Sequence, residues 1–416
     1  MSGEAPAQLR EALASALDLE TLGAPAGNVS VARGSLAGRA VHVALVENRA
    51  ASGSIGEVEG ERLAAAFRVA AIERSPLVLY LDSAGAKVSE GLQALGSFRR
   101  LFRAGLDAAF AGAPIAAVLG RNCFGGSSML AHLARCRLFG PSTRLAMSGP
   151  AVIAASSGMD PLDASFQAMA EAAMSAAARA GASSANTQWT RATDLAGWLR
   201  EALAAPRDAA AGFRAGHDAL AARLVPAPDP IAWEPARRAD LERIYPQGCE
   251  ARECEGLLEG RGRSAEGEER FLGIVGEKPL AAQRAWRFAD LAWRDEGGGT
   301  LRVLLDCASH ATRLEEERIV LTEFIVDMSL ALENLARRGT RVLLTIAGKA
   351  GGGVYVALAA PARHVAAVHG AQIHVLPGAA VTAILGSSRD AIPSFADYHR
   401  AHVAEEELKL GLVPDR

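Results

Sequence analysis

The chain has 416 residues, of which 50% are hydrophobic, 22% charged and only 5% aromatic. This length predicts two domains, and this composition excludes a disordered or fibrous chain. A formal net charge of −3 argues against a broad nucleic-acid surface, which needs a basic excess. Five cysteines, an odd number, favour reduced thiols, and Cys249 and Cys254 lack the second pair that a zinc site needs. With no leader-like N-terminus and no membrane-spanning run, we expect a cytoplasmic protein without a metal.

Residues 41–155 carry a first alternation of strands and helices. The apolar run 76–83 predicts a buried strand, and apolar residues at helical spacing predict a helix over 91–110. A second strand is expected at 113–120, followed by a Gly/Ser turn at 125–128 that opens another helix. Short strands then close the unit.

Residues 272–384 repeat this order. Asp306 lies 224 residues after Asp82, Gly351 lies 226 after Gly125, and His374 lies 227 after Met147. A repeat of this period indicates two similarly folded halves and not a solenoid. The fold class expected is therefore α/β, with two halves in tandem and an Ala-rich helical segment (155–225) between them.

The predicted domain boundaries follow from composition. The first domain takes residues 1–245 and the second takes 271–416. The stretch 246–270 is rich in Glu and Arg, continues a Pro-rich segment, and is interpreted as a linker whose polar end is exposed.

The glycine turn of the first half is the main candidate for chemistry. Gly125 and Gly126, followed by Ser127, stand between a strand and a helix, where unpaired N–H groups bind phosphate or stabilise an oxyanion. The spacing from Gly120 is that of a P-loop, but Gly126 occupies the lysine position, so a nucleotide site is not expected. The loop after the first strand brings Gly85 and Ala86 as further N–H donors. Glycines kept only for tight packing remain the alternative.

Charged side chains near these loops could assist. Lys87 is a possible partner for a carboxylate or phosphate, although it could be a solvated surface lysine. In the second half, Gly351 and Gly352 form a twin turn, preceded by Lys349. His310, in the loop after a strand, and His374, on a strand beside the twin turn, are the acid–base candidates.

These motifs resemble a known family. The segments DSAGAKVSEG and GGSSMLAHLARCRLFGPSTRLAMSGPAVI are similar to the carboxyltransferase branch of the crotonase-like superfamily, and to the β subunit of biotin-independent malonate decarboxylase. GKAGGGVYVALAAPARHVAAVHGAQIHVLPGAAV resembles its γ subunit, so the chain looks like a fusion of the two. The departures in the first loop are Ala84 where the family commonly has Gly and Lys87 where it commonly has Arg. In the second half, Gly352 replaces a serine, and His310 stands near the point where γ subunits carry Pro-Gly.

The resemblance implies a ββα spiral in each half, with the active site between the halves. It implies decarboxylation of a malonyl thioester to the acetyl thioester, with the enolate oxygen held by the amides of the Gly125–Gly126 and Gly85–Ala86 loops. Ser148 and Gly149 lie in the closing segment and are assigned to substrate binding. Such an activity would serve malonate catabolism or supply an acetyl starter unit for polyketide biosynthesis.

The chain carries neither an AMKM biotin-attachment sequence nor an Asp-Ser-Leu phosphopantetheine site. We therefore expect no covalent cofactor, and a substrate delivered on coenzyme A or on the phosphopantetheine of a separate acyl carrier protein. Arg99, Arg100 and Arg103, at helical spacing, would dock an acidic carrier unless they form an ordinary solvated helix face. A homo-oligomer is expected. A biotin-dependent acyl-CoA carboxyltransferase and a non-catalytic assembly subunit are the two alternatives.

Overall fold

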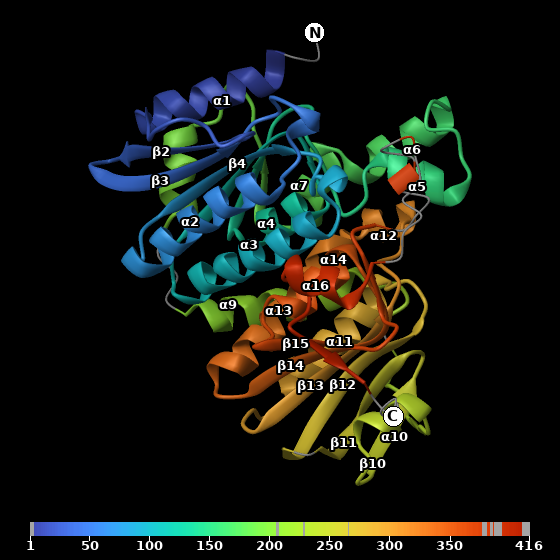
Figure 1. Cartoon of the computed structure of the whole chain (residues 1–416). Coiled ribbons are helices and arrows are strands. Elements are labelled where there is room, and N and C mark those ends of the chain that lie inside the picture. Colours follow the sequence, from blue (N-terminus) through green and yellow to red (C-terminus); the bar gives the residue numbers. More distant parts are fainter. Residues whose placement is uncertain are drawn as a thin grey trace.

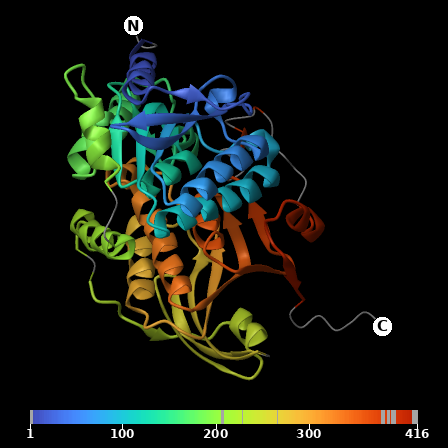
Figure 2. The same cartoon turned by 90° about the vertical axis from the view of Figure 1, so that its left-hand side faces the viewer.

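A computed structural model describes residues 4–204, 208–227, 229–264, 266–376, 381–382, 386 and 393–409. Two α/β halves are stacked, and helices from both halves lie between their two sheets (Figure 1). The helices Glu4–Leu17 and Leu195–Ala202 pack instead on the outer face of the first sheet. After a quarter turn the helices at the interface are seen as a layer between the two sheets (Figure 2). None of the helices described is both long and apolar enough to cross a bilayer.

The first half contains the following elements in chain order: α1 (Glu4–Leu17), β1 (Glu20–Thr21), β2 (Val29–Leu36), β3 (Arg39–Val46), α2 (Glu57–Glu73), β4 (Leu77–Ser83), α3 (Leu92–Phe110), β5 (Ile115–Phe124), α4 (Gly126–Leu133), β6 (Cys136–Phe139), β7 (Arg144–Ala146), α5 (Pro150–Ser157), α6 (Ala164–Met174), α7 (Ala176–Ala182), β8 (Asn186–Gln188), α8 (Leu195–Ala202) and α9 (Ala209–Leu220). The predicted strands and helices of this half are thereby confirmed, including the helical character of the Ala-rich segment.

The first sheet runs in the order β1-β2-β3-β4-β5-β6-β8, and β7 pairs with β5 beyond the end of β6. The strands are antiparallel up to β3 and parallel from β3 onward. Every residue of β4 is buried. A continuous apolar run is what a parallel strand covered on both faces requires.

The second half contains these elements: β9 (Glu234–Pro235), α10 (Ala239–Ile244), β10 (Cys249–Cys254), β11 (Leu257–Ser264), β12 (Gly267–Glu277), α11 (Ala282–Arg294), β13 (Thr300–Cys307), α12 (Leu314–Arg318), α13 (Leu321–Arg337), β14 (Arg341–Gly351), α14 (Gly352–Ala359), β15 (His364–Val368), β16 (Gln372–His374), α16 (Phe395–Arg400) and β17 (Glu406–Leu408). Its sheet runs in the order β17-β15-β14-β13-β12-β11-β10-β9, with β16 paired to β14.

The prediction of a linker at 246–270 is wrong. These residues form β10, β11 and the start of β12, three antiparallel strands of the second sheet. Their charged residues belong to strands with one solvated face, while Leu258 and Phe271 bury the other face against Tyr245. A high content of Glu and Arg therefore marked the exposed side of a sheet.

The two halves are repeats of one fold, as predicted. In each, a long central strand carries two shorter parallel strands one after the other, β6 and β7 on β5, and β15 and β16 on β14. Sheet register pairs Ser83 with Cys123 and Cys307 with Ala350. The counterpart of Gly125 (φ +55°) is consequently Gly352 (φ +51°), and not Gly351 as the sequence spacing suggested.

The halves share one hydrophobic core. α13 packs on α4, and α14 packs on α3. Buried residues from both sides, among them Phe98, Phe102, Phe324 and Tyr355, belong to a single cluster. This packing places the N-termini of α4 and α14 at the same interface.

The three arginines that were expected to dock a carrier protein form ion pairs within the protein, two of them across the interface between the halves. Arg99 is 2.6 Å from Glu405 and Arg103 is 2.8 Å from the buried Glu333, both in the second half. Arg100 is 2.9 Å from Glu61. The prediction of a free basic docking face is therefore wrong, because the three guanidinium groups have acidic partners and two of them tie the halves together.

Candidate active site

One cavity of about 710 Å³ lies between the halves and collects most of the predicted site residues. The first half contributes the loops that contain Ala86, Gly126 and Ser148, and the second half contributes His310 and Gly352. The predicted site residues that line it are Ala86, Lys87, Gly125, Gly126, Ser148, Gly149, His310 and Gly352. The glycine turns of both halves thus open into the same space.

The glycine turn of the first half is fixed by hydrogen bonds. The N–H of Gly125 donates to the carbonyl oxygens of Ala146 and Met147, at 3.2 and 3.1 Å. The hydroxyl of Ser127 donates to the carbonyls of Phe124 and Ser83, at 2.7 and 3.2 Å. Ser127 does not line the cavity; it holds the turn and the neighbouring loop together.

The loop after β4 lies directly against this turn. Gly85 has φ +97°, and a Cβ built on it would be 2.6 Å from the carbonyl oxygen of Phe124, so only glycine fits. Its N–H donates to Ser83 Oγ at 3.0 Å, while Ile55 bonds the loop on both sides of Ala86. The loop and the turn therefore form one rigid surface.

Of the four predicted donors, the amides of Ala86 and Gly126 have no hydrogen-bond acceptor in the described part of the chain. Gly126 is the first residue of α4, whose N–H has no intrahelical partner. The prediction of four free donors is therefore corrected: Gly85 and Gly125 have bonded amides and position the turn, whereas Ala86 and Gly126 line the cavity with amides that have no acceptor among the described residues.

The electrostatics of the cavity favour an anion. The N-termini of α4, α5 and α14 all contribute to its wall, and helix N-termini carry partial positive charge. Lys87 and Arg144 line it, and among the described lining residues there is no Asp or Glu. Lys87 is 2.8 Å from Glu90, whereas Arg144 donates to the neutral Asn122 at 2.9 Å and lies over the Phe124 ring. Arg144 was missed because nothing in its local sequence distinguishes it from other surface arginines.

Ser148 and His310 meet across the two halves. Ser148 Oγ is 2.8 Å from His310 Nε2, and His310 Nδ1 is 3.3 Å from Ser309 Oγ. Burial lowers the pKa of His310 to about 4, so the imidazole is neutral near pH 7. The pair is a neutral hydrogen-bonded unit in the cavity wall.

A buried carboxylate supports Ser148 from behind. Glu317, on α12, accepts hydrogen bonds from the amides of Ser148 and Met147 at 2.8 and 3.1 Å. Burial raises its pKa to about 7, although the nearby Arg179 and both amides oppose the shift. Sequence reasoning missed Glu317 because it stands in a run of charged residues, which normally indicates a solvated face.

Three further predicted residues lie near the cavity but do not line it. His374 Nε2 is 3.1 Å from the carbonyl oxygen of Ala308, and a Cβ on Gly351 would meet the same oxygen at 2.4 Å. The amide of Lys349 donates to Asp306 at 2.9 Å. His374, Gly351 and Lys349 therefore stabilise the second half's loops, and the prediction of His374 as an acid facing the substrate is not supported by its position.

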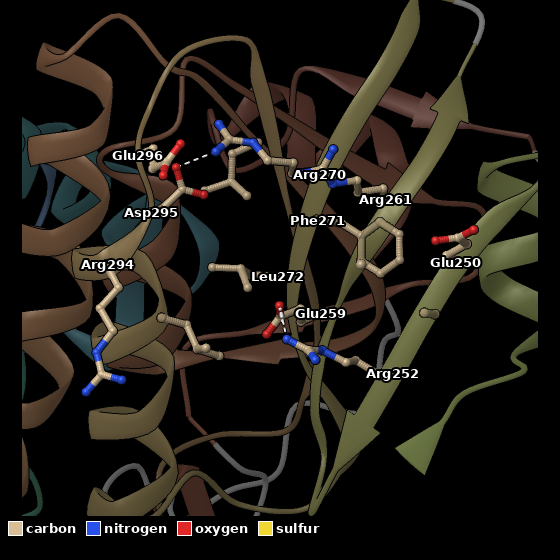
Figure 3. Close-up of a pocket in the computed structure, with 14 residues that line it drawn as sticks. Glu250, Arg252, Glu259, Arg261, Arg270, Phe271, Leu272, Arg294, Asp295 and Glu296 are labelled. Carbon is tan, nitrogen blue, oxygen red and sulfur yellow. Dashed lines mark hydrogen bonds and ion pairs between the residues drawn. The ribbon is translucent and has the colours of Figure 1, made fainter. Parts of the chain in front are cut away.

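Two other cavities in the described part of the chain suit an anionic ligand less well. One of about 630 Å³, at β10–β12 and the end of α11, is lined by four arginines and four acidic residues, with ion pairs between Arg270 and Asp295 and between Arg252 and Glu259 (Figure 3). Another, of about 770 Å³, borders the buried cluster of Glu323, Arg137 and His132. Within the described residues, no group of three His, Cys, Asp or Glu side chains could hold a metal ion.

Comparison with known proteins finds a family model that matches part of the chain. Residues 7–193 match the family model described as the carboxyl transferase domain. The methylmalonyl-CoA carboxyltransferase 12S subunit of Propionibacterium freudenreichii subsp. shermanii is 29% identical over 136 residues, which are 33% of this chain and 26% of the relative. The acetyl-coenzyme A carboxylase carboxyl transferase subunit beta of Gluconobacter oxydans is 32% identical over 124 residues, 30% of this chain and 43% of the relative. The chain thus spans less than half the length of these relatives.

Among solved structures, a Pseudomonas malonate decarboxylase hetero-tetramer in complex with malonate is similar at 23% identity and a TM-score of 0.44, covering 53% of this chain and 91% of that one. A transcarboxylase 12S hexamer structure covers 96% of this chain and 86% of its own, at 17% identity and a TM-score of 0.40. Residues 7–193 are thus similar in sequence to the carboxyl transferase domain.

Proposed function

We propose that the protein decarboxylates a malonyl thioester to the acetyl thioester, without biotin. The observation that carries the proposal is the pair of unbonded amides, Ala86 and Gly126, in the wall of one cavity between the halves. The thioester carbonyl oxygen would accept both N–H groups. Fixed donors of this kind stabilise charge that develops at the oxygen.

The chemistry follows from where charge moves. When the C–C bond to the carboxylate breaks, the electron pair passes into the thioester and leaves an enolate oxygen and CO2. The amides interact more strongly with the enolate oxygen than with the neutral carbonyl, so they lower the barrier and not merely the energy of the bound substrate. Because the turn and the loop are locked together by Ser127, no reorganisation is needed during the reaction.

The charge of the cavity supports an anionic substrate. Arg144, Lys87 and three helix N-termini line it, without an acidic side chain among the described lining residues. The malonyl carboxylate is negative, and so is the phosphate of a phosphopantetheine arm. We expect the arm to belong to coenzyme A or to an acyl carrier protein.

The test is direct. The purified protein is incubated with malonyl-CoA, and separately with malonyl-acyl carrier protein, and the acyl species are followed by mass spectrometry while CO2 is collected. Conversion of either substrate to its acetyl form without added biotin is expected. Full retention of both malonyl species, in a preparation with an intact thermal transition, would overturn the proposal.

A carboxyltransferase acting on an acyl-CoA is the second candidate. It is favoured by the curated relatives, which are carboxyltransferase subunits by name. In that case acyl-CoA would be carboxylated only when a carboxylated biotinyl carrier is supplied, and malonyl-CoA alone would be stable. The same incubation, with and without that carrier, distinguishes the two functions.

A further inference from the structure

The Ser148–His310 pair has a position that the oxyanion pair alone does not explain. Ser148 directly follows Met147, and the carbonyl oxygen of Met147 accepts the N–H of Gly125 at 3.1 Å. The serine is therefore next in the chain to a residue that is hydrogen-bonded to the glycine turn. His310 comes from the other half, and its Nε2 lies 2.8 Å from Ser148 Oγ. Both residues line the cavity.

The internal repeat shows which residue of the first half is equivalent to His310. Leu280 bonds to Ser309 and Ala311 on either side of His310, as Ile55 bonds to Gly85 and Lys87 on either side of Ala86. His310 is therefore the counterpart of Ala86. At this position the first half has the methyl group of Ala86, and the second half has the imidazole of His310, which is hydrogen-bonded to Ser148.

The surroundings hold the pair in place. The Ser148 amide is bonded to the buried Glu317, and Ser309 Oγ is within 3.3 Å of His310 Nδ1. Both side chains are buried, and each has its partners within the protein. A hydroxyl fixed in this way in a cavity wall is suited to proton transfer to a bound ligand.

We propose that Ser148 is the catalytic residue that delivers the proton to the carbon from which CO2 has left, and that His310 restores it. This assignment rests on the proposed function. The enolate electron pair forms the new C–H bond with the proton of Ser148 Oγ, and the Oγ–H bond breaks. His310 Nε2 then returns a proton to Ser148 Oγ.

The proton balance closes over one turnover. The bound carboxylate, an anion in a buried cavity, favours uptake of one proton by His310 from solvent. That proton passes through Ser148 to carbon, and His310 is neutral again when the acetyl thioester leaves. One malonyl carboxylate and one proton thus give CO2 and a methyl group.

Exchange of the methyl hydrogens of acetyl-CoA in D2O isolates this step, since it requires proton transfer but no C–C cleavage. We expect Ser148→Ala to slow the exchange by about 100-fold or more, the usual contribution of a positioned acid–base group. Ser148→Thr should restore part of it. Ser156→Ala, on the exposed side of α5, is the matched control and should exchange at the wild-type rate.

A second measurement covers the possibility that Ser148→Ala does not fold. In a 1:1 mixture of H2O and D2O, Ser148→Cys should give an acetyl product richer in protium than the wild-type product, because thiols concentrate protium relative to water. A purely structural role for residue 148 would leave the isotope ratio unchanged.

The two proposals fail differently. If the wild-type protein converts no malonyl thioester, the proposed function is wrong. If it converts malonyl thioester but Ser148→Ala exchanges at the wild-type rate, or Ser148→Cys gives the wild-type isotope ratio, the proton-donor assignment alone is wrong.

Discussion

The amide of Gly126 can be deleted and its contribution measured. Gly126 is the first residue of α4, a position where proline is tolerated because the missing N–H has no partner within the helix. Gly126→Pro removes one of the two donors, and loss of one such donor costs about 3–4 kcal/mol in transition-state stabilisation, or roughly 10²–10³ in kcat. The expected result is a fall of that size in decarboxylation of malonyl thioester.

A side chain at this position has a second effect, which the control must share. A Cβ built on Gly126 would lie 2.2 Å from Cε1 of Phe98, so the ring must move in any variant. Gly126→Ala keeps the N–H and introduces the same Cβ, and a Phe98→Leu background carried by both variants makes room for it. The ratio of kcat/KM between the alanine and proline variants then reports the amide alone.

The assay is steady-state CO2 release, with circular dichroism and a thermal transition to establish folding. If the proline variant is folded and its kcat/KM is within threefold of that of the alanine variant, the Gly126 amide does not hold the developing charge. The reasoning about the cavity would then be refuted.

Three other predictions concern charge. Arg144→Gln should raise KM for malonyl-CoA about 5- to 30-fold, with a smaller change in kcat. A hydrogen bond to a charged group contributes ~1.5–3 kcal/mol, and this is reduced because the cavity is partly open to solvent. An unchanged KM would show that Arg144 does not bind the substrate. Glu323→Gln should lower the free energy of unfolding by about 3–5 kcal/mol in urea titrations, because it leaves the buried Arg137, 3.1 Å away, without its carboxylate. Burial opposes ionisation of Glu323, but His132, Arg137 and Arg223 hold the pKa of this carboxyl well below its usual range. His310 binds fewer protons in the folded state, because burial lowers its pKa from 6.5 to about 4, so its contribution to stability is complete above pH 6.5 and is lost as pH falls through 4. Between pH 7 and pH 4, the free energy of unfolding measured in urea should therefore fall by up to ~3 kcal/mol less in His310→Gln than in the wild type. An equal fall in both proteins would contradict the burial argument.

The order of the strands and helices outside residues 246–270, the tandem repeat and the location of both glycine turns to within one residue could be predicted from the sequence. The elements and turns depend on neighbours a few positions away: an apolar run for β4, helical spacing for α3, and glycine where φ is positive. The repeat is visible because equivalent residues recur at offsets of 224 to 227 positions. The strands β10–β12 were missed because their many Glu and Arg residues resemble the composition of a linker, and only pairing of the strands showed which side faces solvent.

The composition of the site was decided by the stacking of the halves. Ser148 and His310 are 162 residues apart in the chain, and Glu317 is 169 residues from Ser148. The tertiary structure also decides which amides stay unbonded. The N–H of Gly125 donates to Met147 and that of Gly85 to Ser83, whereas those of Ala86 and Gly126 have no acceptor in the described residues. Local periodicity determines the helices and strands. Hydrogen-bond partners and burial depend on surfaces that meet only when the two sheets and their helices are packed together, and the pKa values of His310 and Glu317 follow from that burial.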